Sequence, residues 1–486
     1  MTKTSLHAAL AIAIALAGTG CVSLAPKLPP AEAGIPGEWP LPPTTQSFVG
    51  AQPLTSDPAA SQEAAATGGA AVADIGWRDF FVDQNLEDLI GRALDNNRDL
   101  RVAVLNVEKA RAQYRIQRAD RLPALNAVAQ LERRGGDNQD VTDAYTAGAS
   151  IANFELDLFG RVRSLSQAAL QRYFAQEEAR RAAQLSLIAE VANAYLTLAA
   201  DRELLSVSEA TLKNQQAAFD LTQKRRELGA VSGLELSQAR TQVEQARADA
   251  ARYAGLVAQD INALNLLVGE QVDPALLPQK LTEGVTGLAA LPAGLPSEVL
   301  LRRPDVLQAE HVLRAQNANI GAARAAFFPS ISLTGFLGSG STELSGLFES
   351  NTRVWSVTPV VNIPIFQGGK RRAGLASAKA DQQIALAEYE KAIQAGFRDV
   401  SNALALTKTL AEQRQAQEAL VEAAARADEL STARYKAGRD SYLNQLDAQR
   451  TLYGAQQGLV STRLAEQANR VTLYKVLGGG WNERSQ

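Results

Sequence analysis

The sequence predicts a mainly α-helical protein built from two copies of one unit, each a hairpin of long helices with a β-hairpin at one end. Three observations support this. Landmarks recur 206–209 residues apart, two long segments show helical patterning without proline, and two pairs of runs alternate apolar with polar residues. Because solenoid repeats recur every 20–50 residues or so, this longer interval indicates a duplicated domain.

The duplication is visible at matched positions. Asp99 and Asp305 are each followed 24 residues later by a proline, and Gly229 and Gly438 each interrupt a long helical pattern. Other matched pairs are Phe159-Gly160 with Phe366-Gln367-Gly368, and Leu267-Val268-Gly269 with Leu477-Gly478. The order of elements in each copy is helix, two β-runs, very long helix, glycine break and returning helix.

The first 20 residues have the features of a secretory signal peptide. Lys3 is followed by the apolar run Ala8–Ala17, which is too short to cross a bilayer as a helix, and then by small residues. Cys21, the only cysteine, comes next; residues 18–21 resemble a bacterial lipobox, although Gly18 replaces the usual aliphatic residue. A lone cysteine in an exported protein has no disulfide partner. We therefore expect a lipoprotein signal peptide over 1–20 and lipidation of Cys21.

The rest of the chain divides into three segments. Residues 21–73 are rich in Pro, Ala, Gly, Ser and Thr and show no periodicity, which predicts an extended N-terminal tether. The first repeat then occupies residues 74–285 and the second occupies 286–486. Val22 stands where aspartate would be the usual inner-membrane retention signal of enteric bacteria, so the sequence favours the outer membrane.

Composition excludes several classes of function. The net charge is −3 with no basic excess, which gives nucleic-acid binding no electrostatic support. The chain has two histidines and one cysteine, so it has too few ligands for a His/Cys metal site and no basis for a histidine-centred catalytic triad. We expect no catalytic residue, no metal site and no cofactor.

Alternating runs predict β-strands at about 124–132 and 145–157, and again at about 330–338 and 353–365. In the last run, apolar Trp355 and Val357 share a face opposite polar Ser356. Each run is about the 9–11 residues that a tilted strand needs to cross a membrane. A small soluble sheet packed on helices would show the same alternation, and this alternative stays open here.

Four strands cannot close a barrel in a membrane. Open edges leave backbone groups unpaired in lipid at several kcal/mol each, and the smallest barrels have about eight strands. If these strands do span a membrane, several chains must combine them, and three chains supply twelve. A homotrimer in contact with membrane lipid follows from the spanning hypothesis.

The proline-free patterns at 161–227 and 371–436 predict helices on the order of 100 Å long. After the glycine breaks, 233–268 and 441–476 return as antiparallel helices of about half that length. Leucine and alanine recur at spacings of three and four, which is typical of helices that pack on other helices. Shorter helices are expected at 83–121 and 303–327.

These features resemble the outer-membrane efflux channel family typified by TolC, and within it the lipidated branch, similar to NodT and OprM, that serves RND-type pumps. The motifs are Leu301-Arg302-Arg303-Pro304-Asp305-Val306, Ala326-Phe327-Phe328-Pro329, Ile363-Pro364-Ile365-Phe366-Gln367-Gly368-Gly369, and Tyr435-Lys436-Ala437-Gly438 leading to Leu446-Asp447-Ala448-Gln449-Arg450. The resemblance implies a trimer with a twelve-stranded outer-membrane β-barrel continuous with a periplasmic α-helical barrel. It also implies a passive conduit for drugs or metal ions, served by a periplasmic adaptor and an inner-membrane pump.

The resemblance assigns roles to residues near the glycine turns. It places these turns at the periplasmic tip, where Gly229, Ala230, Val231, Gly438 and Arg439 are candidate adaptor contacts. The same glycines also suit helix–helix turns for purely conformational reasons.

A periplasmic aperture is expected beside these turns. Tyr435 and Asp447 match positions at which the family narrows its tunnel, and three symmetry-related Asp447 side chains would attract cations. Asn444 stands where some members carry a second carboxylate, and Asp440 could substitute for it. Without the resemblance, a charged residue on a helix usually belongs to a solvated face.

Three other functions are compatible with parts of the sequence. A non-channel coiled-coil lipoprotein of the periplasm would be equally long but would not need two alternating β-pairs. A channel for type I protein secretion fits the same architecture, although lipidation disfavours it. A hydrolase that uses paired carboxylates lacks an evident cleft. The sequence favours the efflux conduit.

Overall fold

A computed structural model of the chain describes residues 24–36, 39, 75–137, 139–281, 297–480 and 482–484. The expected signal peptide, Cys21 and most of the expected tether lie outside these residues. The elements are α3 (Trp77–Phe80), α4 (Gln84–Asn96), α5 (Arg98–Ala119), β1 (Leu125–Gly136), β2 (Gln139–Leu156), α6 (Arg161–Glu227), α7 (Gly233–Val268), η2 (Pro274–Leu276), η3 (Ser297–Arg302), α8 (Pro304–Ala325), β3 (Ser330–Ser341), β4 (Arg353–Asn362), α9 (Lys370–Lys436) and α10 (Tyr442–Val476). Among the described helices, none combines the length and the apolar character needed to cross a membrane.

The chain forms two compact units. Unit 1 draws on Met1–Ala33, Leu105–Glu178 and Leu307–Ala392, and unit 2 on Gly34–Val104, Ala179–Val306 and Ile393–Gln486. Unit 1 contains the strands and the helix ends next to them, whereas unit 2 contains α3, α4, α7, α10 and the glycine turns. Both α6 and α9 have 67 residues, and each contributes to both units. Their length agrees with the long helices that the proline-free patterns predicted.

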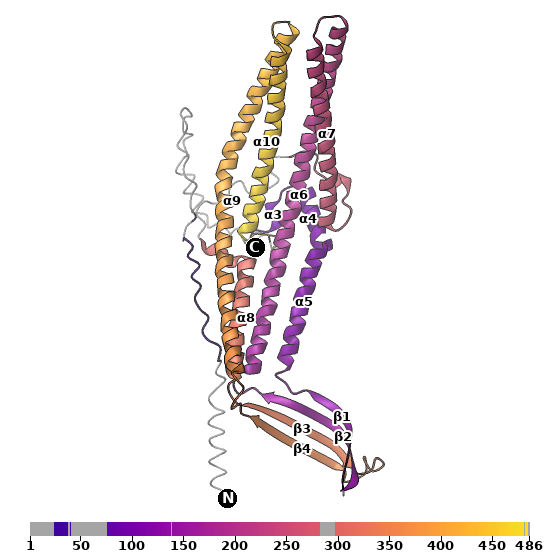
Figure 1. Ribbon diagram of the computed structural model, residues 1–486, viewed down its shortest axis with the longest axis vertical. Helices are drawn as coiled ribbons and strands as arrows, with labels where there is room; N and C mark the ends of the chain where they lie inside the picture. Colours follow the sequence, from indigo (N-terminus) through magenta and orange to yellow (C-terminus); the bar gives the residue numbers. More distant parts are fainter. Residues whose placement is uncertain are drawn as a thin grey trace. The chain divides into compact units, whose positions relative to one another are not determined.

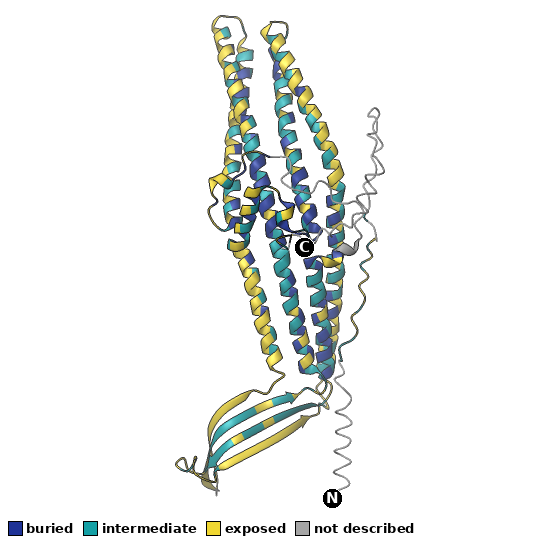
Figure 2. Cartoon of the chain, turned by 180° about the vertical axis from the view of Figure 1, so that it is seen from behind, coloured by how far each residue is buried: buried dark blue, intermediate teal, exposed yellow. Residues whose placement is uncertain are grey.

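Unit 1 is centred on one antiparallel sheet in the order β1-β2-β3-β4 (Figure 1). The two expected hairpins are therefore joined side by side through β2 and β3. The first hairpin is longer than expected, because the polar stretch after Glu132 continues the strand: Arg133 pairs with Asp143 and forms an ion pair at 3.1 Å. Both edge strands are exposed along their whole length (Figure 2).

The sheet has two register shifts, one of them between Arg134 and Gly136 of β1, and its last strand is shorter than expected. The register of β2 against β3 shifts between Ile151 and Phe154, and Asn153 lies there at φ 51° with its N–H donated to Thr334 Oγ1 at 3.3 Å. This bulge breaks the strict alternation that the sequence suggested. The last strand ends at Asn362 rather than at 365, since Pro364 cannot donate a ladder hydrogen bond.

A short N-terminal segment lies along α8 within unit 1. Arg324 donates to the carbonyl of Leu24 at 3.0 Å, and Asn317 donates to that of Pro26 at 2.8 Å. Gly321 lies between these contacts, and a Cβ there would lie 3.0 Å from the nitrogen of Ala25. The glycine thus permits the backbone of the segment to approach the helix closely.

In unit 2, the single helix expected over 83–121 is divided into α4 and α5 at Asn97. This residue is extended (φ −61°, ψ 129°), and its Oδ1 accepts the N–H of Leu100 at 2.9 Å, which is an N-cap. Its Nδ2 also donates to the carbonyl of Leu267 at 2.8 Å and so ties the start of α5 to the end of α7.

The second repeat has the same tie with different chemistry. Arg303 follows Asn97 by 206 residues, and its Nη1 donates at 2.8 Å to the carbonyl of Val476, which follows Leu267 by 209. The same guanidinium forms two hydrogen bonds with Asp305, at 3.0 and 2.7 Å. In each repeat, a hydrogen bond therefore joins the start of the helix that precedes the β-hairpin to the last turn of the returning helix.

The main core of unit 2 gathers around α3. Phe80 stacks on Tyr474 with 3.8 Å between ring centroids, and the Tyr474 hydroxyl donates to the carbonyl of Ile75 at 2.7 Å. Arg78 pairs with Glu483 at 2.7 Å, so α3 is also tied to the C-terminal residues. Further buried members of this core are Trp77, Phe81, Leu86, Ile90, Ile188, Leu196, Leu264 and Val471.

Candidate functional site

The two glycine turns lie at the same end of unit 2 and have the same local structure (Figure 1). Gly229 (φ 74°) and Gly438 (φ 68°) adopt the left-handed conformation, which favours a residue without a side chain. The residue after each glycine donates its N–H to the carbonyl five residues earlier, Ala230 to that of Arg225 and Arg439 to that of Arg434.

The helices that follow the turns are also capped in the same way. The hydroxyl of Ser232 accepts the N–H of Glu235 at 3.2 Å, and the hydroxyl of Ser441 accepts that of Asn444 at 3.3 Å. Each repeat therefore contains a helix–helix turn with closely matched hydrogen bonding. The sequence predicted the glycines but did not single out these serines, although serine is a strongly preferred N-cap.

The residues proposed as adaptor contacts are accessible in these turns. Gly229, Ala230, Gly438 and Arg439 are exposed, and Val231 is half-buried. Beside the first turn the structure also exposes two leucines that the sequence analysis missed, Leu228 at 84% and Leu234 at 68%. Exposed leucines that flank a turn give it an apolar surface on which another protein could pack.

Asp440 has a defined local role. Its carboxylate accepts from Asn444 Nδ2 at 2.5 Å, from Arg434 Nε at 3.1 Å and from the N–H of Ser441 at 2.9 Å. The hydrogen bond from Asn444, followed by that from Arg434, holds the pKa of Asp440 below its usual value. The structure therefore brings Asp440 and Asn444 together, with the aspartate charge opposed by an arginine.

Tyr435 lies in a small cluster that joins the two helical hairpins. Its ring packs near Tyr442, with 5.5 Å between centroids, and against the buried Ala239 and Leu446. Its hydroxyl accepts from Arg225 Nη1 at 3.2 Å. Arg225 lies in the last turn of α6 and Tyr435 in the last turn of α9, so this bond links equivalent regions of the two repeats.

Asp447 directly follows Leu446 of this cluster on α10, and its side chain is exposed. Its carboxylate makes no hydrogen bond or ion pair with any residue that the structure describes, whereas its carbonyl accepts from Thr451 at 2.8 Å. Three residues on, Arg450 donates to Gln242 of α7 at 3.1 Å. The structure thus leaves the charge of Asp447 available to solvent, while Arg450 helps to fix its helix. Cys21 lies outside the described residues.

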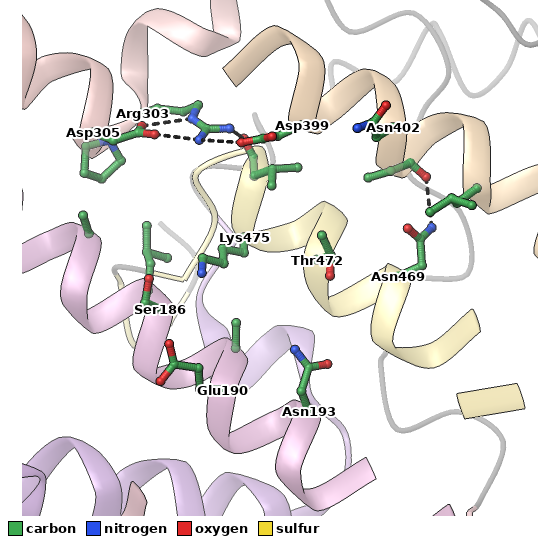
Figure 3. Close-up of a pocket in the computed structure, with 17 residues that line it drawn as sticks. Ser186, Glu190, Asn193, Arg303, Asp305, Asp399, Asn402, Asn469, Thr472 and Lys475 are labelled. Atoms are coloured by element: carbon green, nitrogen blue, oxygen red, sulfur yellow. Dashed lines mark hydrogen bonds and ion pairs between the residues drawn. The ribbon is translucent and has the colours of Figure 1, made fainter. Parts of the chain in front are cut away.

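A cavity of about 490 Å³ lies elsewhere in unit 2, among α6, α9, α10 and the start of α8. Figure 3 shows Arg303 directed at Asp305 and Asp399, at 2.7 and 3.8 Å. The side chain of Arg303 is only 10% exposed and is fully engaged by these partners and Val476. Its guanidinium therefore acts as a structural clamp in the cavity wall.

Among the described residues, no group of three or more His, Cys, Asp or Glu side chains is arranged to hold a metal ion. The predicted residues of unit 2 lie at and near the two helical turns: the exposed glycines, the tyrosine cluster and Asp447, whose carboxylate has no partner among the described residues.

Comparison with known proteins gives a consistent result. The family model for outer membrane efflux proteins matches residues 89–270 and 295–479. The chain is 46% identical to the probable efflux pump outer membrane protein TtgC of Pseudomonas putida, over 100% of this chain and 97% of that protein. It is 43% identical to outer membrane protein OprJ of Pseudomonas aeruginosa, over 98% and 96%.

A solved structure extends the comparison to the fold. The open state of the MtrE outer membrane channel of Neisseria gonorrhoeae matches with a TM-score of 0.84 and 38% identity, over 96% of this chain and 100% of that one. These comparisons confirm the predicted family and fold. They do not support a hydrolase or a non-channel periplasmic lipoprotein. The chain belongs to the outer membrane efflux protein family and is an outer-membrane efflux channel rather than an enzyme.

Proposed function

We propose that three copies of this chain form the outer-membrane conduit of a tripartite efflux system and that small molecules leave the periplasm through it. The exposed edges of the sheet carry this proposal. β1 and β4 are the two edges, and both present apolar side chains, including Leu125 at 73%, Trp355 at 70% and Val357 at 60% exposure.

An exposed apolar edge strand is a template for pairing with another chain. The strands have 12, 18, 12 and 10 residues, which is enough for each to cross a membrane. Pairing β4 of one chain with β1 of the next would leave no free edge in a trimer and would give twelve strands. The apolar side chains would then face lipid.

The partners are inferred from the same relatives. TtgC and OprJ are named as an efflux pump outer membrane protein and an outer membrane protein, and other relatives are named for toluene, solvent or antibiotic efflux. These names support small molecules, rather than secreted proteins, as cargo. We place a periplasmic adaptor at the turns containing Gly229 and Gly438 and an inner-membrane pump, of RND type, below it.

Asp447 is proposed to narrow the conduit near these turns. In a symmetric trimer three unpaired carboxylates would surround the axis, attract cations and repel one another. Tyr435 and Arg225 would hold the hairpins that carry this ring, whereas Asp440, already neutralised by Arg434, would contribute little charge. Cys21, if lipidated, would add a membrane anchor to the one supplied by the sheet.

The test is conductance of the detergent-purified full-length protein in planar bilayers, with its mass in detergent measured alongside. A trimer with discrete, cation-favouring steps is expected. Asp447→Asn removes the charge at nearly constant volume and should reduce cation preference, and Asp447→Ala should also raise conductance. A monomer without conductance would refute the conduit, and unchanged selectivity in both variants would remove Asp447 from the constriction.

A further inference from the structure

The two helical hairpins of unit 2, α6 with α7 and α9 with α10, are joined by a row of polar contacts, here called the internal seam (Figure 1). Its centre is Tyr453 of α10, whose hydroxyl forms hydrogen bonds with Ser208 of α6 at 2.9 Å and with Asp249 of α7 at 3.3 Å. One side chain therefore contacts both helices of the other hairpin. Further hydrogen bonds across the seam join Arg450 to Gln242, Gln457 to Tyr253, Gln215 to Gln449 and Arg225 to Tyr435.

Apolar side chains support the internal seam at two levels. Tyr442 and Leu446 of α10 are buried in a cluster with Ala239 of α7, and Val460 of α10 is buried in another cluster with Leu204 of α6. α10 thus packs against both helices of the first hairpin. Because hydrogen bonds and buried apolar side chains both oppose separation, the two hairpins of one chain are held firmly together.

A closed trimer contains a second kind of seam, between chains. This step rests on the proposed function, which supplies the trimer. Both repeats contribute a hairpin of the same kind, so closing the ring places α7 of one chain against α9 and α10 of its neighbour, as α10 lies against α6 and α7 within the chain. Matched positions in the hairpins differ by 209, as Gly229 and Gly438 do. The sequence therefore specifies which residues meet between chains.

The central contact of the internal seam has no equivalent between chains. Glu244 occupies the position that matches Tyr453, and its carboxylate already pairs with Arg247 at 2.7 Å. Gly458 occupies the position that matches Asp249, and it has no side chain that could accept a hydrogen bond. The seam between chains therefore lacks a residue that ties one helix to two others.

The flanking contacts are also weaker between chains. The matched pairs are Thr241 with Thr451, Ala248 with Thr462, Arg240 with Ala424, and Glu244 with Gln417. Two of these pairs contain an alanine, which has no hydrogen-bonding side chain, and two threonines are too short to replace a bond that an arginine and a glutamine span. Gly233 and Ser237 stand where the internal seam has Tyr442 and Leu446, so less apolar surface is buried.

The contrast is greatest beside the glycine turns. Within the chain, the hydroxyl of Tyr435 accepts a hydrogen bond from Arg225 at 3.2 Å. Between chains the matched residues are Arg226 and Arg434, two cations that repel each other. Arg434 is paired with Asp440 at 3.1 Å, which lessens this repulsion but supplies no bond across the seam.

We propose that the two hairpins of each chain move as one rigid body and that the conduit widens at its turns by parting the seams between chains. Tyr453 is the positioning residue that keeps each body intact. The seams between chains part first, because the regions with the fewest buried contacts and hydrogen bonds open most readily. A trimer would then open in three places rather than six, and the internal seams would stay closed throughout.

Matched crosslinks test which seam parts. The full-length protein carries either Thr241→Cys with Thr451→Cys, across the seam between chains, or Gln242→Cys with Arg450→Cys, across the internal seam, and is treated with a short bis-maleimide. The two pairs occupy equivalent positions of the repeats, and variants with only one of these changes are the controls. The first pair should join separate chains on a denaturing gel and abolish the larger conductance steps in planar bilayers. The second should leave the chains separate and the conductance steps unchanged.

A second measurement tests the role of Tyr453. Tyr453→Phe keeps the ring and removes both hydrogen bonds of its hydroxyl, so hydrogen exchange at residues 449–457 should accelerate roughly 30-fold, the effect of losing two neutral hydrogen bonds. Glu244→Gln, at the matched position of the other repeat, should leave exchange at residues 240–248 nearly unchanged.

Tyr453→Phe should also broaden the distribution of conductance steps, because the two hairpins then move separately. Adding the crosslinked pair Gln242→Cys with Arg450→Cys should restore the wild-type steps. A residue that served stability alone would raise hydrogen exchange and leave the conductance as it is, and that result would remove Tyr453 from the positioning role.

Three results would overturn the proposal: failure of the Thr241→Cys and Thr451→Cys pair to join chains, unchanged conductance steps once they are joined, or loss of the steps when the internal seam is linked. The mass in detergent is measured on the same samples. A monomer without conductance contradicts the proposed function itself, whereas a conducting trimer with any of these three results contradicts only the inference about the seams.

Discussion

The ties made by Asn97 and Arg303 give a prediction about the local stability of unit 2. Arg303→Ala removes one hydrogen bond to the carbonyl of Val476 and two to Asp305. A bond from a charged donor contributes about 1.5–3 kcal/mol, and the pair with Asp305, whose side chain is 46% exposed, about 0.5–1 kcal/mol. The variant should therefore lower the opening free energy of residues 470–480 by roughly 2–4 kcal/mol.

Hydrogen exchange measured by mass spectrometry on the detergent-purified full-length protein tests this. Because each 1.4 kcal/mol is about a factor of ten, exchange in 470–480 should accelerate roughly 30- to 700-fold. Asn97→Ala is the matched variant. It removes two neutral bonds of about 1 kcal/mol each and should accelerate exchange near Leu267 instead, by roughly 30-fold. If Arg303→Ala leaves 470–480 unchanged, or if both variants loosen both segments equally, the paired-tie argument is wrong.

Two further changes test the N-terminal region. Gly321→Val should displace the segment at Ala25, since even a Cβ would lie 3.0 Å from its nitrogen as well as 2.8 Å from Ser164 Oγ, and exchange in residues 24–33 should rise. Gly374→Val, where a Cβ meets nothing, is the matched control and should leave exchange in residues 24–33 unchanged; equal behaviour of the two variants would contradict this. Cys21→Ala should still yield a trimer in the outer-membrane fraction if the sheet supplies the main anchor, and loss of all outer-membrane localisation would refute that.

The long-range pattern of this chain could be predicted because it depends on periodicity and duplication. Helical patterning without proline predicted both 67-residue helices, and the matched glycines predicted both turns. What could not be predicted depends on single side-chain contacts. In the sequence Asn97 cannot be told from an ordinary helical residue, because its role depends on the bond from its amide to Leu267. The bulge at Asn153 likewise involves a contact with a distant strand, at Thr334.

In the candidate site, too, some residues could be predicted from the sequence, whereas others depend on contacts that only the structure shows. Gly229 and Gly438 follow from backbone geometry, and Asp447 was found by resemblance to a family motif. Arg225 was missed, because its role requires that the end of α6 lie beside Tyr435, which is 210 residues away in sequence. The exposed Leu228 and Leu234 beside the first turn were missed for a different reason. A leucine in a helical pattern is normally expected to pack against a neighbouring helix.

A pair of carboxyl groups on α6 and α7 makes the stability of the first hairpin dependent on pH. Burial, and then the charge of the facing Asp201, raise the pKa of Asp260 to about 6, whereas an unperturbed aspartate titrates near 3.9. Between about pH 4 and pH 6 the folded state therefore holds a proton that the unfolded chain has lost. Stability supplied by this group must fall as pH rises through that window and stay constant above it.

Asp260→Asn keeps the shape of the side chain and cannot lose a proton, so it should stabilise the protein at pH 7.5 and change it little at pH 4. The measurement is the difference in thermal unfolding between variant and wild type at the two pH values, which cancels the contributions of carboxylates that do not interact with Asp260. Glu244→Gln, at an ion-paired and exposed position of α7, is the control and should show no such difference. A stabilisation by Asp260→Asn that is equal at both pH values would mean that ionisation of the buried Asp260 carboxyl is not its cause.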